Sequence, residues 1–162
     1  AVPGDALHVS VLNLVHSRSS MPDSMKERLW DTNRQRWLRA IEEVSRGTPP
    51  FEVSLDQVVL APNGVLVAAT DSPEMVSLRE RLGAALDLGR ATPVLCHATI
   101  MRFGRDVPDI ARVRGVLRDL VVKIVTGVTA IRTVRELTYP SLERATIRWH
   151  ELLGPTDVDA RR

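Results

Sequence analysis

Residues 94 to 103 read VLCHATIMRF, and residues 7 to 15 read LHVSVLNLV. Both stretches are rich in β-branched and aliphatic residues, so each is expected to form a strand. In each, a His is followed two residues later by a hydroxyl residue: His8 by Ser10, and His97 by Thr99. Because strand side chains alternate between two faces, each His should project beside its hydroxyl partner, about 7 Å away along the strand.

The second stretch begins a little over half the chain length after the first, which indicates an internal duplication. We treat residues 1–162 as a single domain whose halves, roughly 1–90 and 91–162, each supply a lobe. The expected fold class is α+β: a duplicated, two-lobed domain in which antiparallel sheets form a central cleft and helices pack outside. An approximate two-fold axis would then bring the two His–hydroxyl pairs face to face across the cleft. Facing pairs of this kind would make a phosphate site.

Hydrophobic periodicity and turn residues predict the remaining elements. The expected elements are a helix capped by Asp23 or Ser24 and running to about Ser45, a hairpin of 51–60 and 65–70 around Pro62-Asn63-Gly64, a helix starting at Pro73 and ending before Gly89, a helix from about Pro108 to Thr126, and strands near 128–138 and 143–153. Both halves therefore read as strand, helix, hairpin. The repeated order supports duplication more strongly than the short motifs alone.

The composition is that of a soluble globular protein, with 44% hydrophobic and 26% charged residues. No apolar run approaches the roughly 18 residues needed to span a membrane, and no signal peptide is recognisable, so we expect a cytoplasmic monomer. The single cysteine, Cys96, excludes an internal disulfide and a cysteine-rich zinc site. A net charge of +2 permits an anionic partner without requiring one.

The tetrapeptides HVSV (8–11) and HATI (97–100) resemble the two signature motifs of the two-histidine (2H) phosphoesterase superfamily, which includes bacterial 2′-5′ RNA ligases and RNA cyclic phosphodiesterases. The resemblance extends loosely over almost the whole chain through the order of elements. It implies that His8 and His97 act as general acid and base and that Ser10 and Thr99 bind phosphate. HATIMR also resembles the second motif of the 2′-5′ RNA ligase group in carrying Arg102. Strand alternation puts Arg102 on the face opposite His97, so phosphate contact by Arg102 needs a bulge or the strand end.

These residue types suit phosphoester chemistry. Imidazole, with an unperturbed pKa of about 6.5, can accept a proton in one place and donate one in another at neutral pH. Hydroxyl groups can donate hydrogen bonds to phosphate oxygens. The sequence shows no His-Glu-x-x-His pattern, no carboxylate cluster beside the motifs and no Gly-rich phosphate loop, so we expect neither metal nor cofactor.

The expected function is a metal-independent phosphoesterase acting on a 2′,3′-cyclic phosphate or 2′-5′ phosphodiester of RNA or a nucleotide. Two alternatives stay open: a catalytically lapsed module that binds a nucleotide or RNA end, and a duplicated domain whose motif His residues are structural. The sequence does not choose the physiological substrate, nor which His is the base.

Other conspicuous residues are expected to have structural or surface roles. They are Cys96, Trp30 and Trp37 in the core, His16 in a surface loop, His150 as a structural or surface residue, and Arg112, Arg114 and Arg118 on a solvated helix face.

Overall fold

The computed structural model describes residues 2, 7–15, 20–69, 72–88, 95–103, 109–138 and 143–154, except for the side chains of residues 138 and 143. In chain order the elements are α1 (Asp23–Arg46), β1 (Phe51–Ala61), β2 (Gly64–Ala69), α2 (Pro73–Leu86), β3 (His97–Arg102), α3 (Ile110–Arg118), β4 (Ile124–Val128), β5 (Ala130–Thr138) and β6 (Glu143–Glu151).

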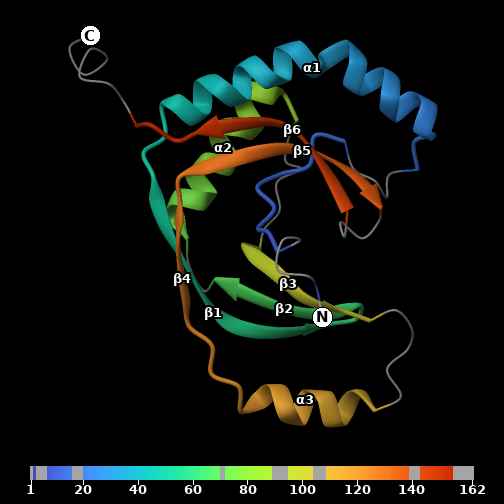
Figure 1. Ribbon diagram of the computed structural model, residues 1–162, viewed down its shortest axis with the longest axis vertical. Coiled ribbons are helices and arrows are strands. Elements are labelled where there is room, and N and C mark those ends of the chain that lie inside the picture. The colour runs from blue at the N-terminus through green and yellow to red at the C-terminus, as the bar shows by residue number, and fades with distance from the viewer. Residues whose placement is uncertain are drawn as a thin grey trace.

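The strands form two antiparallel sheets. The first has the order β3-β2-β1-β4, and the second is the hairpin β5-β6. Thr129 alone separates β4 from β5, so the chain passes directly from one sheet to the other. Residues 7–15 run between β3 and the hairpin (Figure 1) and join β3 through an antiparallel bridge between Val9 and Ala98. Together these segments curl into a half-barrel.

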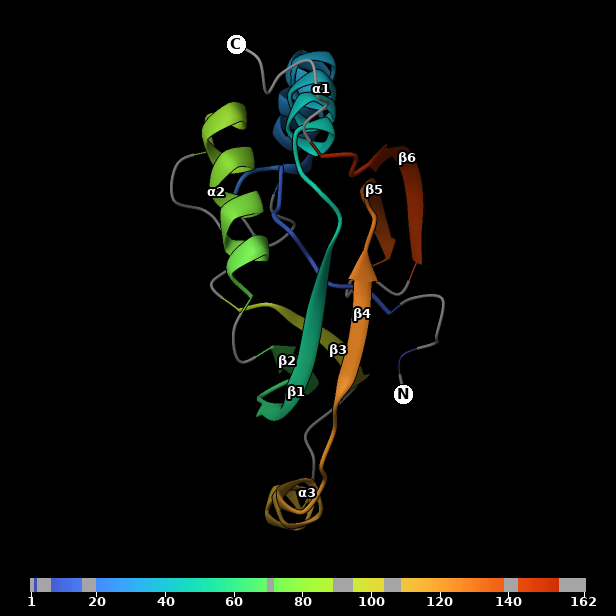
Figure 2. The same ribbon diagram turned by 90° about the vertical axis from the view of Figure 1, so that its left-hand side faces the viewer.

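The helices lie outside this half-barrel. Helices α1 and α2 pack against each other, and α1 covers the β5-β6 hairpin. Helix α3 lies at the opposite end of the molecule from α1 (Figures 1 and 2). This arrangement confirms the expected two-lobed α+β class.

Two clusters of buried apolar side chains form the core of the protein. The first joins α1, α2 and β5, and its buried members are Trp37, Ile41, Leu78, Leu82, Leu86 and Ile131. The second lies on the four-stranded sheet, and its buried members are Val53, Leu55, Val67, Ala69, Met75 and Cys96. Trp37 is buried and Trp30 packs beside it, with ring centroids 6.2 Å apart, so both tryptophans belong to the core as expected. Cys96 is also a core residue, as expected.

Several local predictions are confirmed. Helix α1 begins after Pro22, with Asp23 in its first turn and Arg46 in its last, a distribution that favours the helix dipole. Neither Asp23 nor Ser24 serves as its N-cap, which is Pro22. The hairpin β1-β2 turns where Pro62-Asn63-Gly64 predicted it. Pro73 is the first residue of α2, as its fixed φ favours.

The helix expected from Pro108 to Thr126 was too long. The helical part, α3, ends at Arg118, and Ile124–Val128 forms β4, which pairs with Phe51–Leu55 of β1. The segment after Arg118 is rich in β-branched residues, which lose side-chain freedom in a helix and pack well on a sheet. Pairing with β1 therefore overrides the helical pattern.

The stretch 7–15 does not form a regular strand. Its described residues form one bridge to a strand, at Val9. The carbonyl oxygens of Ser10 and Val11 accept hydrogen bonds from the Arg79 side chain instead of from a neighbouring strand.

Each lobe takes elements from both halves of the chain. The β1-β2 hairpin of residues 1–90 shares a sheet with β3 and β4 of residues 91–162. Helix α1 of the first half packs against the β5-β6 hairpin of the second half. The two halves are thus interleaved. Within the described residues, no helix is long and apolar enough to cross a membrane.

Candidate functional site

The bridge between Val9 and Ala98 brings the two motif segments side by side. In an antiparallel pair, directly opposed residues share a face, and neighbours along each segment point to the other face. Val9 and Ala98 both pack into the second apolar cluster, as does Val67, the partner of Ala98 on β2. His97 and Thr99, which flank Ala98 on β3, therefore project from the opposite face of the sheet.

Regular pairing continued on both sides of the bridge predicts the relative positions of the four motif side chains. It would set His8 opposite Thr99 and Ser10 opposite His97. The two imidazoles would then occupy one diagonal of a four-cornered patch, and the two hydroxyls would occupy the other. Residues on such a diagonal are about 7–8 Å apart, with their Cβ atoms somewhat closer. Side chains at this spacing can contact one phosphate-sized group from several sides.

A regular antiparallel pair has a local two-fold axis at its centre, and in this register the axis would relate His8 to His97 and Ser10 to Thr99. The two-fold relation between the motif pairs stays a prediction. The bridge shows that the two motif segments are neighbours.

A bulge in β3 determines the direction of Arg102. The pairing of β2 with β3 shifts between Thr99 and Met101, so Ile100 is an extra residue on β3. The pairs on the motif face are Ala68 with His97, Leu66 with Thr99, and Gly64 with Arg102. The bulge cancels the alternation that would have turned Arg102 away. Arg102 therefore shares the face of His97 and Thr99, and it is half-buried there.

His97 has a main-chain partner. Its Nδ1 lies 3.3 Å from the carbonyl oxygen of Leu95. A carbonyl oxygen only accepts hydrogen bonds, so this contact favours the tautomer with hydrogen on Nδ1. The Nε2 atom of His97 is then the one with a lone pair for proton transfer.

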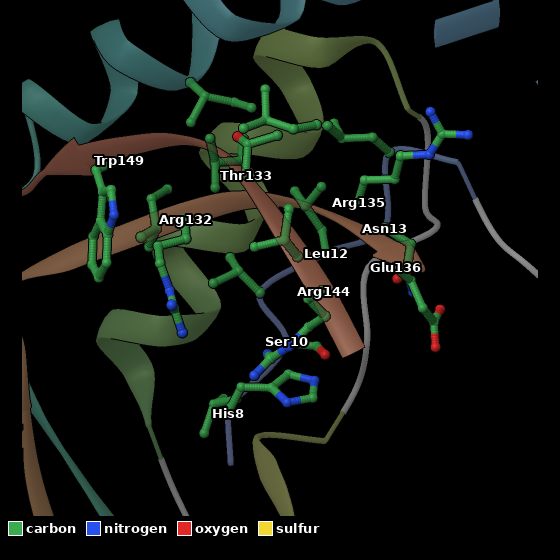
Figure 3. A pocket seen from close by; sticks show the side chains of 18 of the residues that line it. His8, Ser10, Leu12, Asn13, Arg132, Thr133, Arg135, Glu136, Arg144 and Trp149 are labelled. Atoms are coloured by element: carbon green, nitrogen blue, oxygen red, sulfur yellow. The ribbon is translucent and has the colours of Figure 1, made fainter. Parts of the chain in front are cut away.

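A cavity of about 870 Å³ opens between the 7–15 segment and the β5-β6 hairpin. His8 and Ser10 line it, whereas His97, Thr99 and Arg102 do not. Figure 3 shows Arg132 and Arg144 extending from the hairpin toward the segment that carries His8 and Ser10. His97, Thr99 and Arg102 therefore share one face of β3, and of the predicted site residues only those of the first motif line the cavity.

The cavity carries charges of both signs. Its basic lining residues are Lys26, Arg132, Arg135 and Arg144, and its acidic ones are Asp23, Glu27 and Glu136. Arg135 pairs with Glu27, and Lys26 pairs with Asp23 at 3.1 Å. The Arg132 guanidinium instead lies over the Trp149 ring, 4.8 Å from its centroid, a cation–π distance. Trp149 is 60% exposed, so an aromatic and a cationic surface adjoin on this wall.

A buried network lies behind the cavity wall. His150 is 1% exposed; its Nε2 lies 3.1 Å from Thr133 Oγ1 and its Nδ1 lies 3.1 Å from Glu42 Oε2. Burial lowers the pKa of His150, and the Glu42 hydrogen bond opposes that change in part. Burial raises the pKa of Glu42, but the His150 hydrogen bond and the charges of Arg46 and Arg148 outweigh it, so the net pKa is below the usual value. His150 is thus a structural residue, one of the two roles expected for it.

The remaining expectations concern residues away from the motifs. Arg112, Arg114 and Arg118 are exposed on α3, as expected for a solvated helix face. His16 lies outside the described residues. Within those residues, no group of three or more His, Cys, Asp or Glu is placed to hold a metal ion.

Two features of the site were missed from the sequence. The sequence does not distinguish the cavity arginines from ordinary surface residues, because isolated basic residues on a strand are common on surfaces. Arg79 could have been recognised as buried. It lies four residues after Met75 and three before Leu82, so helical periodicity puts it on the buried face of α2.

No protein-family model and no curated protein matches this chain. Among solved structures, the chain resembles the crystal structure of TT0787 of Thermus thermophilus, with a TM-score of 0.69 and 18% sequence identity. The match covers 96% of this chain and 82% of that chain. At this level of identity the similarity establishes a shared fold.

Proposed function

We propose that this protein is a metal-independent phosphoesterase of the two-histidine type, acting on a 2′,3′-cyclic phosphate or a 2′-5′ phosphodiester of RNA or a nucleotide. The observation that supports the proposal is the Val9–Ala98 bridge, which brings the two segments that carry the motif His and hydroxyl residues side by side.

In this proposal the histidines divide the proton transfers. When a 2′,3′-cyclic phosphate is hydrolysed, one imidazole removes a proton from the attacking water while oxygen bonds to phosphorus. The other imidazole donates a proton to the 2′ or 3′ oxygen as its bond to phosphorus breaks. The Leu95 contact supports His97 as a proton acceptor in its neutral form. The roles exchange in the reverse reaction.

The other corners of the patch serve the phosphate. Ser10 and Thr99 donate hydrogen bonds to the non-bridging oxygens, where charge accumulates in the transition state. Arg102, turned to the same face by the bulge, adds a positive charge at the strand end. Arg132 and Trp149 on the cavity wall suit a neighbouring phosphate and a nucleobase.

A second candidate is a binding module of the same fold without catalysis. It is favoured by the cavity lining, which includes His8 and Ser10 but not His97 and Thr99. A module of this kind would retain nucleotide or RNA ends on the cavity wall and would leave the phosphoester intact.

The test is turnover of 2′,3′-cyclic AMP and of a 2′-5′-linked dinucleotide by the purified chain, followed by ³¹P NMR. We expect a bell-shaped pH profile and a loss of roughly 10²–10⁴-fold in kcat for His8→Ala and for His97→Ala. The double variant should lose less than the product of the single losses, because the pair acts as a unit. EDTA should leave the rate unchanged.

His16→Ala is the matched control, since His16 lacks a hydroxyl residue two places later, and it should retain activity. Turnover that persists in the double His variant, or that EDTA abolishes, would refute the proposal. Nucleotide binding without turnover would establish the binding module instead.

A further inference from the structure

Arg79 is a charged residue on the buried face of α2. It is 3% exposed, and burial lowers the pKa of its guanidinium, opposed by the nearby Cys96. An arginine nevertheless stays protonated at neutral pH, so its charge must be satisfied by hydrogen bonds. Among the described residues, Arg79 has no carboxylate within ion-pair distance, and its partners are main-chain carbonyl oxygens.

These carbonyls belong to both motif segments. Arg79 Nε donates to the carbonyl oxygen of Val11 at 2.9 Å, and Nη2 donates to those of Ser10 at 2.7 Å and Leu95 at 3.3 Å. Ser10 is a residue of the first motif, and Leu95 precedes the second motif by two residues. The guanidinium therefore binds both segments at once.

Its position coincides with the end of the motif pairing. The antiparallel register at Val9 and Ala98 would next bring Val11 opposite Cys96 and Leu12 opposite Leu95. No bridge forms there among the described residues, and the Arg79 side chain takes the place of the missing ladder. The planar fork of an arginine holds its donors in fixed directions toward two carbonyls of one segment and a third on the other, whereas a lysine ammonium is a point charge on a flexible stem.

The Leu95 carbonyl links Arg79 to the proposed chemistry. It accepts from Arg79 Nη2 and lies 3.3 Å from His97 Nδ1, so the same oxygen orients the imidazole of the second motif. On the other segment, Arg79 binds the carbonyl oxygen of Ser10, the hydroxyl residue of the first motif.

We infer that Arg79 is a positioning residue that sets the register of the two motif segments against each other, and through it the separation of His8 and His97. This inference rests on the proposed function. Arg79 does not contact the reacting group; it acts through the backbone of Ser10 and Leu95. A misplacement of about 1 Å between catalytic groups can lower a rate about 10²-fold.

The experiment compares Arg79→Lys with Arg81→Lys. Arg81 lies on the same helix and also bonds to oxygens of another segment, Thr48 Oγ1 at 2.9 Å and Val44 O at 3.3 Å, away from the motifs. We expect Arg79→Lys to lower kcat for 2′,3′-cyclic AMP about 10²-fold with little change in KM, and Arg81→Lys to leave both unchanged. In a His97→Ala background, Arg79→Lys should cause little further loss, because the group it positions is gone.

The outcomes separate a positioning role from a merely structural one. An equal loss in the wild-type and His97→Ala backgrounds, or an equal loss from Arg81→Lys, would overturn the inference. If Arg79→Lys does not fold, Arg79→Ala refolded with ethylguanidinium replaces it: turnover restored by the added cation supports the inference, and folding restored without turnover overturns it.

The two proposals can fail separately. If the wild-type chain turns over no phosphoester, the proposed function fails. The positioning role of Arg79 is then tested by NMR of the imidazole rings. Shifts of both the His8 and His97 ring signals in Arg79→Lys, absent in Arg81→Lys, would support positioning. Unchanged ring signals would overturn it.

Discussion

Replacing His150 with Phe should destabilise the fold by leaving a buried hydroxyl without its partner. Thr133 is buried, and its Oγ1 contacts His150 Nε2 at 3.1 Å. Leaving such a group unpaired costs about 1–3 kcal/mol. Glu42 loses its contact as well, but its side chain is 23% exposed and keeps an ion pair with Arg46, so it adds little. We therefore expect a loss of about 1–3 kcal/mol in the free energy of unfolding.

A second substitution tests this reasoning. Thr133→Val removes the hydroxyl itself, and replacing both partners of a hydrogen bond with apolar groups can be nearly neutral. The double variant His150→Phe with Thr133→Val should therefore recover most of the lost stability. Urea unfolding at pH 7.5, followed by tryptophan fluorescence, gives the four free energies of the cycle, provided the m-values agree. Additive losses, or a His150→Phe variant as stable as the wild type, would refute the proposed network.

The same variant should change the pH dependence of stability. The pKa of His150 is lowered by burial, from an ordinary value of 6.5, so the unfolded chain binds a proton more readily than the folded chain. Stability should therefore fall as the pH drops below about 6.5, with this residue adding a slope of at most about 1.4 kcal/mol per pH unit. Glu42 acts in the same direction at lower pH, since its pKa is also lowered. His150→Phe should flatten the curve just below about pH 6.5, and a slope there equal to that of the wild type would contradict the assignment.

Two further predictions concern the cavity wall and the hairpin. Trp149→Leu should weaken nucleotide binding roughly 5- to 100-fold if a base stacks on the ring beside Arg132, measured by calorimetry, and an unchanged affinity would exclude stacking. Gly64→Ala should lower both the melting temperature and turnover, because an added Cβ would come within 2.2 Å of the Met101 carbonyl oxygen and push β3 away from β2. Gly115→Ala on α3 is the matched control, with no atom within 4 Å of the added Cβ, and a similar loss in both variants would show that steric contact is not the cause.

The sequence predicts those elements whose signals are local. The apolar stripe of α1, the Pro62-Asn63-Gly64 turn and the proline at the start of α2 are each read from a few neighbouring residues, and each is found where expected. The end of α3 was misjudged because the strand that follows is defined by its partner β1, which is about 70 residues away in the chain. A pattern within one segment carries no information about its partner.

The relation between the two motifs also depends on pairing between segments that are distant in the chain. Each His–hydroxyl pair is visible in the sequence, but the face that Arg102 occupies depends on a one-residue shift in the pairing of β2 with β3. The contacts of Arg79 with both motif segments depend on where α2 packs. Arg79 could have been noticed as a charge on an apolar helix face, yet its partners are main-chain carbonyls, which have no signature in the sequence.

The register of the motif bridge is therefore the quantity on which the proposed site depends most. A slip of one residue at the bridge would put His8 or Ser10, in place of Val9, beside Ala98 on the face that packs into the apolar cluster. A single bridge stabilises this register only weakly against such a slip. The close packing of Gly64 on β3 fixes one side of the motif pair, and the buried guanidinium of Arg79 fixes the other. A local two-fold relation between the motif pairs would follow from regular pairing alone, so it would not require that each half of the chain fold as its own lobe.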